Sequence, residues 1–112
     1  MLTFIIVLYS IVALIGIYLF TKLFLNKPSK LLVGIIHGLL GLFGISFLII
    51  YTSFLPGDTP AVSILLFVAA FFFGGGMFVM SVQDKKFPKV IALIHVAIAV
   101  TGIVFLVKFW IG

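Results

Sequence analysis

Two histidines are the residues of this sequence whose type and spacing could do chemistry. His37 lies in "LLVGIIHGLLGLFG" (31–44) and His95 in "IALIHVAIAVTG" (91–102), each within an apolar run rich in glycine or alanine. An imidazole binds metals through either ring nitrogen and also carries protons. Because an ionisable side chain inside an apolar segment is costly, it is a functional candidate. The pair therefore predicts a metal or cofactor ligand set, or a proton relay.

The elements that hold these histidines are apolar enough to cross a membrane. The chain has 112 residues, of which 65% are hydrophobic and 8% are charged, and one small soluble domain cannot bury that much apolar surface. Its four long apolar stretches each suffice to cross about 30 Å of hydrocarbon at about 1.5 Å per residue. They cover about 2–25, 31–55, 61–82 and 90–110. We therefore predict an all-α integral membrane protein with one transmembrane domain over residues 1–112.

The predicted links between these helices set the arrangement of the bundle. They are short and contain proline: "NKPSK" (26–30), "PGDTP" (56–60) and "QDKKFPK" (83–89). Short links make consecutive helices antiparallel neighbours, which predicts an up-down-up-down four-helix bundle. Six of the 7 basic residues flank the first and third links. The positive-inside rule then predicts that these links lie in the cytoplasm and both termini outside. We expect the membrane to be a bacterial inner membrane.

Charge and cysteine content exclude several classes of function. The net charge of +5 is accounted for by membrane topology and anionic lipid headgroups, so no nucleic-acid partner is expected. The chain contains no cysteine, which excludes structural disulfides, covalently attached c-type haem and cysteine-ligated clusters.

An internal repeat relates the two histidines, which are 58 residues apart. The same offset aligns identical residues in the two halves: Gly16 with Gly74, Gly44 with Gly102, and Phe47 with Phe105. We interpret the chain as two helical hairpins of one design, related by an axis along the membrane normal. His37 and His95 are then expected at equal depth near the cytoplasmic boundary, facing each other from diagonally opposite helices.

Small residues accompany each histidine on its helix face. At about 100° per residue, the small residues on the histidine side are Gly34, Gly41 and Gly44 around His37, and Ala92, Ala99 and Gly102 around His95. Two such strips leave a slot between the helices, and an empty slot loses packing contacts. We therefore expect a flat molecule to fill it.

Non-covalent haem b meets this requirement. Its iron accepts two axial imidazoles from opposite faces, here His37 and His95, and its macrocycle needs the room that the small residues leave. Lysines near the cytoplasmic boundary, among them Lys30 and Lys89, are expected to neutralise the two propionates.

The histidine elements resemble those of membrane b-type cytochromes. "HGLLGLFG" from His37 and "HVAIAVTG" from His95 are similar to the cytochrome b561-like four-helix core over about half the chain. The resemblance implies one bis-histidine haem and electron transfer, as a cytochrome or membrane oxidoreductase, with a quinone or another small redox partner. Cytochromes of that type generally hold two haems through four histidines, and this chain has 2, so a second haem would have no histidine ligands.

Three other interpretations remain open. A site for a metal ion alone would have only two histidine ligands, because the acidic residues, Asp58 and Asp84, lie in links. Zinc usually takes three or four protein ligands. A small transporter would relay protons through the histidines and would form a homo-oligomer through its glycine strips. A non-catalytic accessory subunit would pack those glycines against a larger partner and would be colourless.

Overall fold

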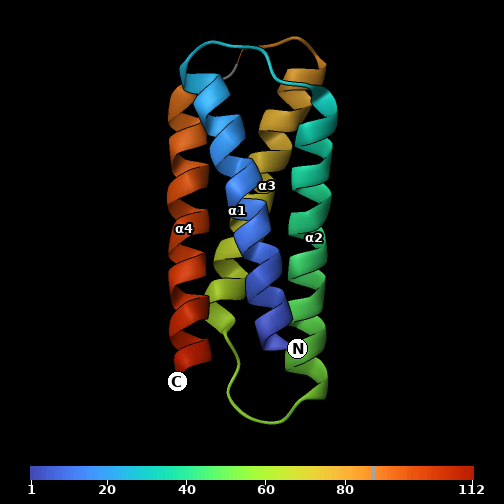
Figure 1. Ribbon diagram of the computed structural model, residues 1–112, viewed down its shortest axis with the longest axis vertical. Helices are drawn as coiled ribbons and strands as arrows, with labels where there is room; N and C mark the ends of the chain where they lie inside the picture. Colours follow the sequence, from blue (N-terminus) through green and yellow to red (C-terminus); the bar gives the residue numbers. More distant parts are fainter. Residues whose placement is uncertain (87) are drawn as a thin grey trace.

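Four long helices form one bundle in the computed structural model, which describes residues 1–86 and 88–112 (Figure 1). They are α1 (Leu2–Phe24), α2 (Leu31–Phe54), α3 (Ala61–Val82) and α4 (Lys89–Ile111). Each helix is long and apolar enough to cross a membrane, so the prediction of an all-α protein with four such segments is confirmed. Phe87, in the third predicted link, lies outside the described residues.

Large apolar side chains cover the outside of the bundle. Among the most exposed are Leu14, Leu65 and Phe72, with exposed fractions of 68%, 70% and 73%. Water would disfavour such a surface, whereas lipid chains would not, because they are themselves apolar. The outer faces therefore indicate an integral membrane protein in contact with lipid.

The helices pack around a square, each against two neighbours. Both α1 and α3 contact α2 and α4, which leaves α1 opposite α3 and α2 opposite α4. Figure 1 shows both termini at one end of the bundle together with the α2–α3 link, and the α1–α2 and α3–α4 links at the other. We call the second end the lysine end because six lysines lie there: Lys22, Lys27, Lys30, Lys85, Lys86 and Lys89.

Helices α1 and α3 end in the same way at the lysine end. Asn26 and Asp84 follow them with φ values of 54° and 55°, a left-handed conformation that these two residue types tolerate. The backbone bonds that close the turns run from Lys27 N to Lys22 O at 2.9 Å and from Lys85 N to Met80 O at 2.8 Å. Both are the six-to-one bonds of a helix-terminating Schellman motif. The two turns are 58 residues apart.

The tightly packed core occupies the half of the bundle near the termini. Its centre is a stacked pair, Tyr9 of α1 on Phe67 of α3, with ring centroids 4.0 Å apart and an interplanar angle of 11°. A Cβ atom built on Gly44 would lie 2.7 Å from Tyr9, and one on Gly102 would lie 2.9 Å from Phe67. These two glycines therefore make the space that admits both rings.

The other half of the bundle buries few residues. Within the segments of that half, residues 13–41 and 72–99, Ala92 is the only described residue that is buried. The buried hydrophobic cluster lies entirely in the terminal half and consists of Ile5, Tyr9, Ile45, Leu48, Phe67 and Leu106. The two halves of the bundle thus differ in how many side chains they shield from the surroundings.

Replacing Tyr9 by phenylalanine is expected to raise the thermal unfolding midpoint in detergent. The Tyr9 hydroxyl is buried without a hydrogen-bond partner, and leaving such a group unsatisfied costs about 1–3 kcal/mol. The corresponding residue 58 positions later is already Phe67. Tyr18→Phe is the control, because Tyr18 is exposed and should leave the midpoint unchanged. A lower midpoint for Tyr9→Phe alone would show that the hydroxyl contributes to stability.

Candidate functional site

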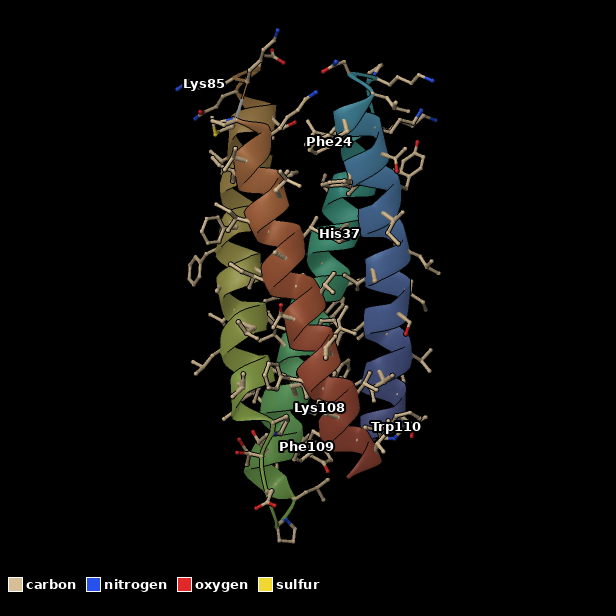
Figure 2. All side chains as sticks on the ribbon, turned by 90° about the vertical axis from the view of Figure 1, so that its left-hand side faces the viewer. Phe24, His37, Lys85, Lys108, Phe109 and Trp110 are labelled. Atoms are coloured by element: carbon tan, nitrogen blue, oxygen red, sulfur yellow. The ribbon has the colours of Figure 1, made fainter. Side chains whose placement is uncertain are left out.

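The two histidine rings meet across the centre of the bundle. His37 on α2 and His95 on α4 come from opposite helices, and their ring centroids lie 6.3 Å apart at an interplanar angle of 70°. Both side chains are half-buried. His37 lies seven residues after Lys30, and His95 lies six residues after Lys89, so both rings belong to the half of the bundle near the lysine end. Figure 2 shows His37 between the ends marked by Lys85 and Lys108.

Each histidine ring rests on a glycine of a neighbouring helix. A Cβ atom at Gly16 of α1 would lie 3.0 Å from Cε1 of His37, and one at Gly74 of α3 would lie 3.0 Å from Cε1 of His95. The two contacts are equivalent at the 58-residue offset. Sequence reasoning aligned these glycines with each other but did not assign them to the site. Their alignment in the repeat was the signal that could have found them.

One histidine is held in a defined tautomer by a backbone carbonyl. Nδ1 of His95 lies 2.8 Å from the carbonyl oxygen of Ala70 on α3. Because a carbonyl only accepts hydrogen bonds, Nδ1 carries the proton and donates it, which leaves the lone pair of Nε2 available as an acceptor or metal ligand. A second ring nitrogen bonded in this way is usual for histidines that ligate metals.

The other histidine is less well satisfied. Val12, which corresponds to Ala70 at the 58-residue offset, has its carbonyl beside the His37 ring. Nδ1 of His37 is nevertheless buried without a hydrogen bond of acceptable geometry. The two histidines, although equivalent at the 58-residue offset, thus differ in hydrogen bonding.

The distance between the rings is compatible with an ion held between them. Metal–imidazole bonds of about 2 Å place two opposed nitrogens about 4 Å apart, with the ring centroids farther out on either side. The observed centroid separation of 6.3 Å is compatible with that spacing. The described residues contain no group of three or more histidine, cysteine or acidic side chains that could hold a metal ion.

The six small residues expected around the histidines fall into different environments. Gly44 and Gly102 are covered by Tyr9 and Phe67, so aromatic rings fill the interior at their level. The remaining four lie in the half near the lysine end: Gly34, whose added Cβ would lie 4.0 Å from Phe78; Gly41, with nothing within 4 Å; buried Ala92; and half-buried Ala99. Gly44 and Gly102 therefore do not border an open slot, because a glycine admits a neighbouring side chain as readily as a cofactor.

The lysines predicted near the site separate into two groups. Lys89 is half-buried, and its Nζ lies 5.3 Å from the centroid of the Phe24 ring. Lys89 also lines a pocket of about 540 Å³ at the lysine end, which we call the lysine pocket. The other lining residues are Leu23, Asn26, Lys27, Pro28, Lys85 and Lys86. Lys30 is exposed and is not among them.

Comparison with known proteins identifies no relative. No family model, curated protein or solved structure matches the chain. The function must therefore be inferred from the histidine pair and its surroundings.

Proposed function

We propose that the protein binds one haem b between His37 and His95 and transfers electrons within the membrane. The observation that carries this proposal is the pair of imidazoles from opposite helices, with ring centroids 6.3 Å apart and each ring seated on a glycine. His37 and His95 would hold the haem, which would supply one-electron chemistry at its iron. Such a site favours outer-sphere electron transfer over binding of oxygen.

The donor set favours haem over a metal ion alone. The chain has 2 histidines, no cysteine and 2 acidic residues, and the acidic residues, Asp58 and Asp84, lie outside the four helices. Two imidazoles are too few for the usual zinc site. They suffice for haem iron, since the porphyrin provides the equatorial ligands. The bond from His95 to Ala70 supports the role of His95 because it orients the ring and leaves Nε2 free.

Small residues near the histidines support a cofactor in the same half. Ala92 is the only buried residue described within 13–41 and 72–99, and Gly41 has nothing within 4 Å of an added Cβ atom. In our proposal Gly34, Gly41, Ala92 and Ala99 leave room for the macrocycle. Gly16 and Gly74 position the two ligands.

The remaining parts of the proposal concern orientation and partners. We propose that the chain is built from two repeated hairpins in an up-down-up-down bundle, with the lysine end in the cytoplasm of a bacterium and the termini outside. Lys89, and Lys30 from the adjacent link, would neutralise the propionates. A quinone or another small redox partner would exchange electrons with the site.

The visible absorption spectrum of the purified protein in detergent tests this function. We expect a sharp reduced α band after dithionite, and a pyridine haemochrome assay should give about one haem b per chain. A protein that stays colourless after expression with added haem would contradict the proposal. The histidine pair would then be assigned to proton relay or helix packing.

A further inference from the structure

We propose that the lysine pocket binds the phosphate group of an anionic phospholipid. Two segments far apart in the sequence form this pocket. The end of α1 and its link contribute Leu23, Asn26, Lys27 and Pro28, and the other link and the start of α4 contribute Lys85, Lys86 and Lys89. Four lysines line a hollow of about 540 Å³. The fold, rather than a run of basic residues, therefore creates the concentration of positive charge.

The charge in the lysine pocket has no acidic counterpart in its lining. Among the described residues, none that lines the pocket is a carboxylate, and Asp84, which precedes Lys85, is not part of the lining. Ammonium groups that share a hollow repel one another, so an anion with several oxygen acceptors lowers the free energy of the pocket. A phosphate group supplies such acceptors and pairs with lysine as a point charge.

The position of the pocket favours a lipid as the source of that phosphate. It lies where four apolar helices end, which is the depth of the lipid headgroups. Its lining combines an apolar side chain, Leu23, with the lysines, and Lys89 extends over the Phe24 ring. Lysines in such a place keep their stems in the apolar layer and their ammonium groups among the headgroups. Basic pockets at the cytoplasmic ends of helices commonly bind anionic lipid headgroups.

Native mass spectrometry of the detergent-solubilised protein with equal amounts of phosphatidylglycerol and phosphatidylcholine tests the proposal. We expect selective retention of phosphatidylglycerol. The double variant Lys27→Gln/Lys86→Gln should bind it about 30-fold more weakly, which corresponds to about 2 kcal/mol for two lysines. The single variant Lys85→Gln should show a smaller loss in the same direction.

The matched control is Lys22→Gln/Lys108→Gln, which removes the same charge at two positions outside the pocket and should retain the lipid preference. Equal losses in both double variants, or equal retention of the two lipids by the unchanged chain, would overturn the proposal.

Displacement of the lipid by sodium phosphate at constant ionic strength would overturn the assignment to a lipid and indicate a soluble phosphate. Lys89 is proposed for both sites, so the variant His37→Ala/His95→Ala, which removes the proposed haem ligands, tests the pocket separately and should still bind phosphatidylglycerol.

Discussion

Replacing either His37 or His95 by alanine is expected to abolish the low-spin b-type spectrum of the purified protein. Each change removes one of the two proposed axial ligands, and the other ring cannot replace it because it comes from the opposite helix. Removing a residue that only hydrogen-bonds to a metal ligand lowers the affinity for the metal about 10–100-fold. Removing the ligand itself should therefore lower the haem content at least tenfold. The haem-to-protein ratio from the pyridine haemochrome measures it.

These variants should remain folded, which makes the result interpretable. Alanine favours a helix, and the buried hydrophobic cluster lies in the other half of the bundle. Lys108→Ala is the control, since Lys108 is exposed near the end of α4, far from the rings, and should leave the spectrum unchanged. A normal low-spin spectrum in either histidine variant would contradict the proposed ligand pair.

Gly74→Val is expected to produce the second-largest effect, a loss of haem binding of about tenfold or more. Even a Cβ atom at this position would lie 3.0 Å from Cε1 of His95. The ring cannot swing aside freely, because its Nδ1 donates a 2.8 Å hydrogen bond to Ala70. Overpacking of this kind costs about 1–3 kcal/mol, and 1.4 kcal/mol corresponds to a factor of ten in affinity. Titration of the apoprotein with haemin measures the loss, and Gly16→Val should act in the same way on His37.

The control for this change is available one residue further along the same helix. A Cβ atom at Gly75 would have nothing within 4 Å, so Gly75→Val alters helix propensity by the same amount without touching a histidine. It should bind haemin as the unchanged chain does. Equal losses in Gly74→Val and Gly75→Val would attribute the effect to the helix, and the proposed seat for His95 would be wrong.

Much of the architecture could be predicted from residue types alone. The expected segments 2–25 and 31–55 differ by one residue from α1 and α2 as observed. Such agreement arises because the length of an apolar run and the position of the next charge or proline define where a membrane helix begins and ends. The 58-residue offset also pointed to His37 and His95 as a pair, since equivalent residues in two copies of a hairpin share a depth.

The neighbours of the histidines could not be predicted in this way. A helical projection shows which residues share the face of His37, but it does not show which side chain of another helix will enter that face. Gly44 was therefore expected to border a slot, whereas the ring of Tyr9 covers it. Gly16 was seen only as an aligned residue, although its missing side chain is what makes room for His37.

Hydropathy and spacing along the chain were enough to predict the four apolar helices, their short links, the lysine-rich end and the pairing of the two histidines. The contacts between helices are visible only in the folded bundle: His95 bonds to Ala70, Gly16 and Gly74 lie against the histidine rings, and lysines from two distant links line one pocket. The rotation of each helix about its axis sets these contacts. Here every helix is apolar all round, so packing between side chains, rather than an amphipathic pattern readable in the sequence, selects that rotation.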